Sequence, residues 1–458
     1  MNNLKFVILL TILFICSTNA QSTFDAVRIR QNEIGFGARN LAMGGNGITS
    51  ANDYSAIYWN PAGLASLQFN QFTAEFSHLH YANSATFGDN LSDMDNSFTR
   101  FRNIGLAVPL PTTRGSFVLA FGYNYVRDFD EYLFFSGFNQ NSNGLEFELA
   151  DENGIYDWYA FDRDVYQTEE ISSEGGLHQW SFGGALAISP SVDLGVAFNI
   201  WRGKEEYSLL FTQEDSEDLY SVYPGDFDSY TLDQHLLSGY KAFSMKFGGM
   251  FKLNQITRLG LAVELPSTFT VTEEYSSSDV LVFDDGYTDP FEYEPGTWQY
   301  KVKTPYRFDA GIGFTLQNLQ LHAGSTYQDW RQIRFEKPDS WSLDTDYQAL
   351  LNENPAFRRD YRATLDYHAG AEILIPNSNV SLRGGYALRS SPLKDATSDM
   401  DKSIYSGGVG LQIGRNTILD VTYTYGTWQK LSEDIYTPGG TAEQITENRI
   451  FLGLRVIF

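Results

Sequence analysis

Apolar and polar residues alternate with a period of two in many short segments of this chain. Around residue 420, Leu419, Val421 and Tyr423 occupy one face, and Asp420 and Thr422 occupy the other. A period of two predicts a β-strand, and a length of about ten residues suits a tilted strand that crosses a bilayer. We predict fourteen such strands, over residues 72–80, 101–109, 116–126, 177–188, 192–201, 242–252, 257–265, 306–315, 319–327, 365–375, 379–388, 404–413, 417–425 and 449–458.

The connections between these segments differ in length. Short turns, at 189–191, 376–378 and 414–416, alternate with long polar stretches at 127–176, 202–241, 266–305 and 328–364. Outer-membrane barrels have this asymmetry, with short periplasmic turns and long external loops, and closure removes the strand edges that lipid cannot satisfy. The predicted fold is therefore all-β: a fourteen-stranded antiparallel transmembrane β-barrel over residues 72–458.

The last strand ends the chain with the alternating sequence NRIFLGLRVIF. Leu454, Val456 and the terminal Phe458 share one face. This pattern resembles the C-terminal insertion signal of bacterial outer-membrane barrels, and it implies the barrel-assembly machinery as a partner.

A barrel of fourteen strands needs something inside it. About eight strands leave a bore that side chains fill, whereas 16 to 18 leave an aqueous channel. We predict that residues 21–71, before the first strand, form a hatch in the bore. Asn60 could cap a helical turn with Pro61 at its first position, although the same residues would also suit a simple turn.

Glycines support this hatch, because they recur on the strand face opposite to the apolar one. Glycine in a strand marks bending or the close approach of another backbone. The glycines on that face are Gly105, Gly122, Gly183, Gly195, Gly248, Gly260, Gly311, Gly313, Gly324, Gly370, Gly408, Gly410 and Gly453. Curvature of the strands alone is the alternative explanation.

The first residues, MNNLKFVILLTILFICSTNA, are typical of a secretory signal peptide over residues 1–20, with cleavage before Gln21. A lipoprotein signal with Cys16 as the lipidated residue is the competing interpretation, and Ile15 fits it poorly. Because Cys16 is the only cysteine, residues 21–458 have no disulfide and no cysteine ligand for a metal. After the signal, no run of about 18 apolar residues predicts a membrane helix.

The formal net charge of −25 argues against nucleic acid, and against anionic lipid as the main partner, because both would be repelled. The acidic stretches match no calcium loop, so we interpret them as solvated loop charge and predict no metal or cofactor. His78 and His80 share a strand face and could contact a metal, but a position at the rim of the barrel explains them as well. No G-x-S-x-G motif occurs, and we predict no enzymatic activity.

Several segments resemble the FadL-type outer-membrane transporters of long-chain fatty acids and other hydrophobic compounds. They are GARNLAMGGNGITSANDYSAIYWNPAGLASL at 37–67, TPYRFDAGIGF at 304–314, STYQDW at 325–330 and LRGGYALRSSPL at 382–393. The resemblance implies that an N-terminal hatch plugs a fourteen-stranded barrel, that its movement opens a path, and that release can occur laterally. It assigns Asn60, Pro61, Ala62, Gly63 and Leu64 to this gate.

The resemblance implies passive uptake of hydrophobic small molecules or lipids, long-chain fatty acids among them, across the outer membrane of a Gram-negative bacterium. A carboxylate ligand would need a cation, and Arg307, Arg383 and Lys246 are candidates on the luminal face. The alternative is that these cations are structural partners of luminal acids such as Asp309, Glu372 or Glu264. The N-terminal motif is also similar to PorV-like barrels, which implies a scaffold for protein secretion or surface attachment as the alternative function.

Overall fold

The computed structural model describes residues 22–45, 47–338 and 345–458 of the chain. The predicted signal peptide, with Cys16 and the cleavage site before Gln21, lies outside the described residues.

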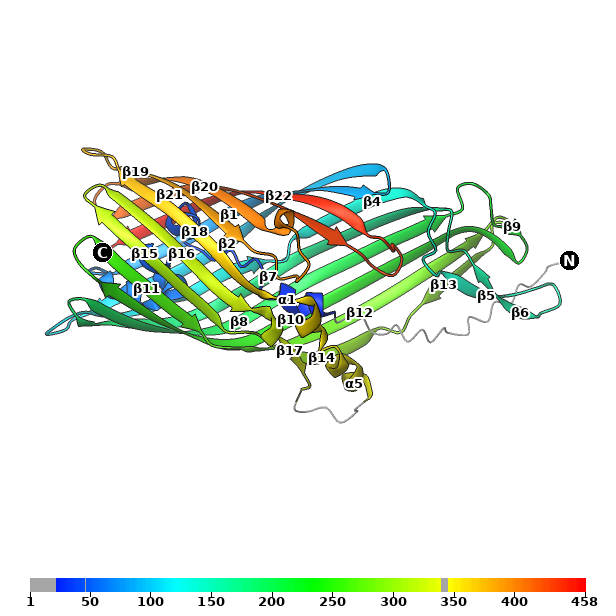
Figure 1. Cartoon of the computed structure of the whole chain (residues 1–458), viewed down its shortest axis with the longest axis horizontal. Helices are drawn as coiled ribbons and strands as arrows, with labels where there is room; N and C mark the ends of the chain where they lie inside the picture. Colours follow the sequence, from blue (N-terminus) through cyan, green and yellow to red (C-terminus); the bar gives the residue numbers. More distant parts are fainter. Residues whose placement is uncertain (1–21, 46, 339–344) are drawn as a thin grey trace.

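Fourteen antiparallel strands close into a barrel (Figure 1). Each wall strand pairs with the strands before and after it, and β1 closes the cylinder by pairing with both β2 and β22. The wall strands are β1 (Gln71–Phe87), β2 (Asn90–Leu110), β3 (Phe117–Asp128), β7 (Val165–Ser189), β8 (Val192–Glu214), β10 (Gly225–Lys252), β11 (Thr257–Glu264), β15 (Arg307–Leu316), β16 (Leu319–Asp329), β18 (Ala363–Leu374), β19 (Val380–Arg389), β20 (Lys402–Ile413), β21 (Thr417–Ser432) and β22 (Thr441–Ile457). The predicted fold class and each of the fourteen predicted strands are confirmed, and Leu454, Val456 and Phe458 lie in or directly after the closing strand β22.

The apolar face of the wall strands points outward. On β8, Leu194, Phe198 and Ile200 are 42%, 38% and 39% exposed, whereas Ala197 and Trp201 between and after them are buried. An outward apolar band on a closed barrel is the surface that lipid covers. Among the described residues, no helix has the length and the apolar character needed to span a membrane.

Three of the predicted long loops are wrong as loops, because 127–176, 202–241 and 266–305 are mostly strand. These residues extend the wall on one side of the barrel, so that the long strands project to the right in Figure 1. Their outward face is polar, since they lie beyond the lipid band, and a search for apolar alternation therefore overlooks them. The added strands are β4 (Glu131–Asn139), β5 (Glu146–Ala150), β6 (Tyr156–Ala160), β9 (Ser221–Val222), β12 (Thr268–Phe283), β13 (Thr288–Glu292), β14 (Gly296–Lys303) and β17 (Arg334–Glu336).

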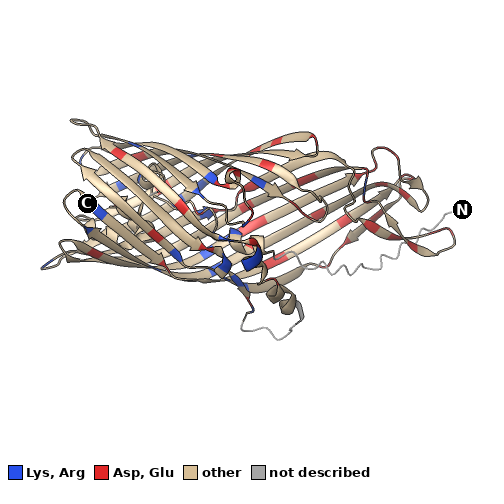
Figure 2. Ribbon diagram, in the orientation of Figure 1, with Lys and Arg blue, Asp and Glu red and all other residues tan. Residues whose placement is uncertain are grey.

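Helical structure interrupts the remaining connections. In the fourth predicted loop lie η3 (Trp330–Gln332), α5 (Thr345–Asn352) and α6 (Ala356–Asp360), and η4 (Ser398–Met400) precedes β20. Asp and Glu residues are spread over the projecting wall and its loops (Figure 2).

The N-terminal segment, residues 22–70, forms five short helical turns: α1 (Thr23–Arg28), α2 (Ala38–Leu41), α3 (Gly47–Ser50), α4 (Ala56–Trp59) and η2 (Pro61–Ser66). Ser22 and Asp25 start α1 with reciprocal side-chain to backbone hydrogen bonds. α2 contacts β20, β21 and β22, α3 contacts β11, β15 and β16, and η2 contacts β3, β7, β8 and β10. Contacts with opposite sides of a closed wall put this segment in the bore, where Figure 1 shows its dark blue turns.

Candidate functional site in the bore

A ring of inward-facing glycines receives the N-terminal segment. A Cβ on Gly195 would lie 2.3 Å from the carbonyl carbon of Pro61, and one on Gly260 would lie 2.3 Å from the carbonyl oxygen of Ile48. Such distances are closer than packed atoms allow, so a side chain at these positions would push the segment away from the wall. The predicted glycines that meet residues of this segment are Gly105, Gly122, Gly183, Gly195, Gly248, Gly260, Gly311, Gly313, Gly370, Gly408 and Gly453.

Gly410 differs from the other glycines of the predicted set. An added Cβ there would meet the guanidinium of Arg383 at 2.4 Å rather than the N-terminal segment. Gly385, which was not in the set, faces Gly44 at 2.2 Å. Close approach of the N-terminal segment therefore accounts for most of the inward glycines, by its backbone at Gly195, Gly260 and Gly370 and mainly by its side chains at the others, and strand curvature is not needed for them.

Asn60 joins the N-terminal segment to the wall. Its Oδ1 accepts a hydrogen bond from the backbone N–H of Ala62 at 3.2 Å, which caps η2 with Pro61 in the first turn. Its Nδ2 donates to the carbonyl of Ile48 at 3.0 Å and to the carbonyl of Gly249 on β10 at 3.1 Å. One buried side chain thus satisfies three backbone groups on three pieces of chain.

The rest of the predicted gate motif is packed around this cap. Ala62 and Leu64 are fully buried, and Gly63 lies where an added Cβ would be 2.4 Å from the carbonyl oxygen of Ala51. These residues belong to η2, which packs against the strands β7, β8 and β10.

Replacing Asn60 with alanine is expected to loosen residues 22–70 without unfolding the barrel. The change removes the cap and takes one donor from each of the carbonyls of Ile48 and Gly249, a loss of about 2–4 kcal/mol for the attached segment. Trypsin cleavage at Arg28, Arg30 and Arg39 in the folded barrel should then be faster by at least roughly tenfold.

Asn60→Asp separates the two roles of this residue. It keeps the acceptor that caps η2 and puts a carboxylate oxygen against the carbonyls of Ile48 and Gly249. We expect cleavage as fast as in Asn60→Ala. Wild-type resistance in Asn60→Asp would mean that the cap alone matters and that Asn60 does not hold the wall.

Tyr54 enters the wall where two strands have no side chains. Cβ atoms on Gly105 and Gly122, which are cross-strand partners, would both lie 2.2 Å from its ring or hydroxyl. The Tyr54 hydroxyl donates to Asn124 Oδ1 at 3.1 Å, and Asn124 Nδ2 in turn donates to Ser181 Oγ at 3.1 Å. The segment is therefore hydrogen-bonded to β3 and, through Asn124, to β7.

A chain of alternating charges connects the N-terminal segment with four wall strands. Its members, in order of contact, are Arg39, Glu372, Arg383, Asp420, Arg455 and Asp53. Arg39 Nε and Nη2 donate to the two oxygens of Glu372 at 2.8 and 2.9 Å. At the other end, Arg455 Nη1 lies 3.1 Å from Asp53 Oδ2. Both ends of the chain are therefore side chains of the segment, and its middle is the wall.

A second charged network surrounds the part of the N-terminal segment between α1 and α2. Its members are Arg30 and Glu33 from the segment and Lys246, Glu264, Arg307 and Asp309 from the wall. Arg30 Nη2 lies 3.1 Å from Glu264 Oε2, and Lys246 Nζ lies 3.1 Å from Asp309 Oδ2.

The structure places each predicted luminal cation against a carboxylate. Arg307 contacts Asp309 at 3.2 Å, Arg383 contacts Glu372 at 2.6 Å, and Lys246 contacts Asp309. These are the structural partnerships that the sequence offered as the alternative to ligand binding.

Arg127 on β3 is a buried cation that the sequence analysis did not select. It is 7% exposed, its Nη1 donates to the carbonyl of Asn32 at 3.5 Å, and its Nε has no hydrogen-bond partner among the described residues. Its guanidinium lies 5.4 Å from the ring centre of Phe129. A buried guanidinium with an unused donor beside an aromatic ring could bind the carboxylate of an apolar molecule.

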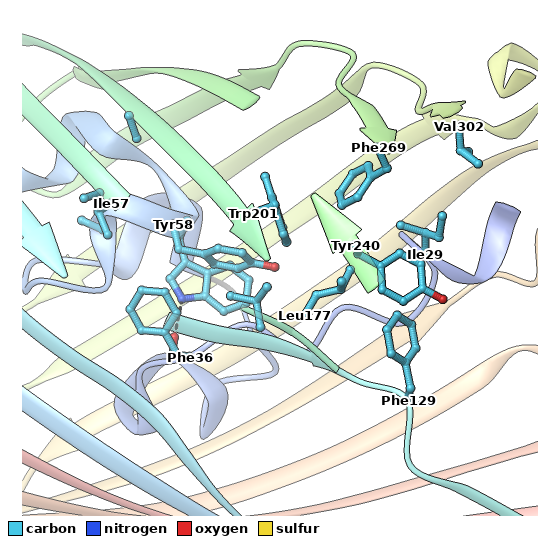
Figure 3. Close-up of a cluster of buried hydrophobic side chains, with 14 of the residues drawn as sticks. Ile29, Phe36, Ile57, Tyr58, Phe129, Leu177, Trp201, Tyr240, Phe269 and Val302 are labelled. Carbon is cyan, nitrogen blue, oxygen red and sulfur yellow. Dashed lines mark hydrogen bonds between the residues drawn. The ribbon is translucent and has the colours of Figure 1, made fainter. Parts of the chain in front are cut away.

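The bore beyond α2 to α4 is lined by apolar and aromatic side chains. Figure 3 shows Phe129, Leu177, Trp201, Tyr240, Phe269 and Val302 in one cluster with Ile29. The rings of Phe129 and Tyr240 are 5.3 Å apart, and those of Trp201 and Phe269 are 5.7 Å apart. These side chains give the bore an apolar lining on the side of the charged networks that faces the projecting wall.

A second aromatic cluster covers the inner face of the projecting wall. It contains Leu149, Phe161, Leu209, Phe211, Phe227, Tyr230, Leu232, Leu281 and Phe283. Tyr436, from the connection between β21 and β22, stacks on Phe211 at 4.9 Å. Beside it, burial and then the neighbouring Asp434 raise the pKa of Glu169 to about 10, so the Glu169 carboxyl is protonated at neutral pH.

The segment leaves little space beside α2. A cavity of about 30 Å³ lies there, and Glu75, Asp53, Tyr54 and Arg455 are among its lining residues. This volume holds a water or two, whereas a cavity that takes up benzene measures about 150 Å³. An aromatic molecule therefore has no room to pass at this point unless the segment moves.

The wall itself is incomplete between β2 and β3. Their pairing runs from Leu110 and Phe117 only as far as Asn103 and Asn124, above which β2 pairs with β1 alone. Beyond that point β4 packs beside β2 without a main-chain ladder among the described residues, and Asn90 Nδ2 donates to the carbonyl of Ser136 at 3.2 Å. The barrel thus has a seam in its main-chain ladder at the level of Arg127.

The remaining candidates do not form a metal site. His78 and His80 face outward on β1, where they contact Thr99 Oγ1 at 2.9 Å and Ser97 Oγ at 3.2 Å. In the part of the chain that the structure describes, no group of three or more His, Cys, Asp or Glu residues is arranged to hold a metal ion.

Comparison with known proteins gives a match in structure alone. No family model and no curated protein matches the chain in sequence. The toluene transporter TodX of P. putida matches with a TM-score of 0.59 at 12% identity, covering 93% of this chain and 99% of that one. The toluene transporter TbuX of Ralstonia pickettii matches with a TM-score of 0.51 at 15% identity, over 93% and 99% of the two chains.

A FadL homologue of Pseudomonas aeruginosa matches with a TM-score of 0.54 at 13% identity, over 90% of this chain and 95% of that one. The predicted resemblance to FadL-type transporters is thereby confirmed as a shared fold that extends over nearly the whole chain.

Proposed function

We propose that this chain is an outer-membrane channel for the passive uptake of hydrophobic molecules, in which residues 22–70 are a movable hatch. The observation that carries the proposal is a bore lined by aromatic side chains and filled by a segment that the wall accommodates with glycines. Apolar surface favours apolar solutes, and the equilibrium between a seated and a displaced hatch would set the rate of passage.

The path would begin at the projecting wall. A hydrophobic molecule could exchange contacts with the cluster around Phe211 and Phe227, then with the cluster around Trp201 and Tyr240, before it meets the hatch. The seam beyond Asn103 and Asn124 offers a lateral exit at the boundary between the lipid-facing band and the projecting wall, and Arg127 lies beside it.

Two substrate classes fit this bore. Neutral monoaromatic molecules, such as the toluene for which the transporters TodX and TbuX are named, need only the apolar lining. Long-chain fatty acids need in addition a cation for the carboxylate, and we assign that role to Arg127, because Arg307, Arg383 and Lys246 already have carboxylate partners.

Uptake into proteoliposomes tests the proposal and its specificity together. Labelled toluene and a labelled long-chain fatty acid should enter faster with the protein than without it. Arg127→Gln should slow fatty-acid entry by about tenfold, the loss of one charge-assisted contact, and leave toluene entry unchanged. A matched control is Arg415→Gln, which removes an exposed arginine from the turn between β20 and β21.

The outcomes separate the functions. Equal entry of both labels with and without the protein would contradict transport and leave the PorV-like scaffold as the better interpretation. Protein-dependent entry that Arg127→Gln slows equally for both labels would contradict the assignment of Arg127 as the carboxylate site and keep the channel.

A further inference from the structure

A strip of cations lies on the outer surface of this acidic protein, directly above the lipid-facing band. Along β8 the outward residues are apolar as far as Ile200, and the next two outward positions are Arg202 and Lys204. On β10 the outward residue Phe243 is 53% exposed, and the next outward position is Lys241. The change from apolar to cationic therefore occurs at the same level on adjacent strands.

The register aligns these side chains in one row around the wall. Arg202 is the direct cross-strand partner of Lys241, Lys241 is the partner of Thr270 on β12, and Thr270 is the partner of Lys301 on β14. Lys303, the next outward residue of β14, is the partner of Arg334 on β17. The strip comprises Arg202, Lys204, Lys241, Lys301, Lys303 and Arg334.

These side chains face outward, because their neighbours face inward. Trp201 is 1% exposed, Tyr240 6% and Val302 0%, and successive residues of a strand point to opposite faces. Arg202, Lys204 and Lys241 are exposed, and no carboxylate lies within ion-pair distance of them among the described residues.

Like charges directly opposite each other on neighbouring strands are destabilising. The strip has two such pairs, Arg202 with Lys241 and Lys303 with Arg334. Among the described residues, Arg334 alone of these four has a carboxylate at ion-pair distance, Glu336 at 2.8 Å. An anion placed between the cations would turn this repulsion into attraction.

The strip is confined in both directions. The outward residue of β8 after Lys204 is Glu206. Its row in the register also contains Glu174 on β7 and Glu274 on β12. On the opposite side of the barrel, the outward residues at the rim are uncharged polar side chains or histidines, such as Thr99, Asn448 and His78. The positive charge is therefore limited to at most two successive outward positions on a strand and to the strands from β8 to β17.

We infer that this strip binds the phosphate groups of a phosphorylated glycolipid in the outer leaflet. A headgroup phosphate lies at the level where the apolar band ends, the level of Arg202, Lys241 and Lys303, and its acyl chains would cover Phe243 and Ile200 below. The total charge of −25 argues against an anionic lipid only as an average over the chain, whereas binding depends on the charges within a Debye length of about 8 Å. The inference rests on the membrane position in the proposed function and does not depend on transport.

Binding of lipid A to the purified full chain in detergent micelles tests this inference. Arg202→Gln with Lys241→Gln should weaken binding of bisphosphorylated lipid A by about thirtyfold, since each cation near an anionic lipid surface contributes a factor of about five. Arg114→Gln with Arg415→Gln is the matched control, because it removes two exposed arginines from turns at the other end of the barrel. Transport activity is not part of the readout, so a failure of the proposed function leaves this test intact.

Two further arms identify the source of the phosphate. Fully dephosphorylated lipid A should bind the wild-type chain no better than it binds the double variant, and inorganic phosphate should compete only at millimolar concentration. Unchanged binding in the double variant would overturn the inference, and so would inorganic phosphate that binds as tightly as lipid A. If the double variant does not fold, as judged by the mobility of the unheated barrel in a gel, Lys241→Gln alone should weaken binding about fivefold, and unchanged binding in it would count equally against the strip.

Discussion

Replacing Arg39 with alanine is expected to open the bore to small hydrophilic solutes and to lower the free energy of unfolding by about 3–5 kcal/mol. Arg39 is 5% exposed, and its guanidinium also donates to the carbonyl of Ser50 at 2.9 Å and to Asn52 Oδ1 at 2.8 Å. Its loss leaves Glu372 with one cation fewer and frees the chain around α3. Single-channel conductance in planar bilayers and urea unfolding in lipid vesicles measure the two effects.

Two variants control this result. Arg39→Lys keeps the charge and loses the planar fork that bonds both oxygens of Glu372, so we expect an intermediate conductance. Arg415→Ala removes an exposed arginine from a turn and should change neither quantity. Conductance of Arg39→Ala at the wild-type level would show that the charged networks do not hold the segment in place.

The strands and the closure of the barrel could be predicted because their signals are local. Alternation with a period of two identifies a strand from its own residues, and the outward apolar face of β8 follows from Leu194, Phe198 and Ile200 alone. The glycines gave a further indication, because an added Cβ on Gly195 or Gly248 meets the segment that contains Asn60 and Pro61.

The projecting wall could not be predicted in the same way. Residues 225–241 of β10 alternate as regularly as the rest of the strand, but both of their faces include polar side chains, and an apolar search ends at the lipid boundary. Beyond that boundary, water solvates the outward face, so polarity no longer distinguishes a strand from a loop.

The partners inside the bore are long-range and equally hidden. Arg39 and Glu372 are 333 residues apart in sequence, and Tyr54 and Asn124 are 70 apart. Only the register of the closed barrel brings them together. The seam between β2 and β3 was missed for a related reason, because alternation identifies strands but not the length over which neighbouring strands pair.

A disulfide between the hatch and the wall is expected to abolish uptake. An added Cβ on Gly453 of β22 would lie 3.2 Å from the Cβ of Ala38 in α2, and disulfides span about 3.5–4.5 Å between Cβ atoms, so a small backbone shift accommodates the bond. The only cysteine of the sequence, Cys16, belongs to the predicted signal peptide, and the introduced pair would therefore have no competing thiol in residues 21–458.

The uptake of labelled toluene by vesicles that contain Ala38→Cys/Gly453→Cys tests most directly whether the hatch must move. Under oxidising conditions the rate should fall to that of protein-free vesicles, a reductant should restore it, and each single cysteine variant should be active under both conditions. Uptake by the oxidised double variant at the rate of its reduced form would contradict a moving hatch, because molecules would then cross while residue 38 stayed fixed to β22.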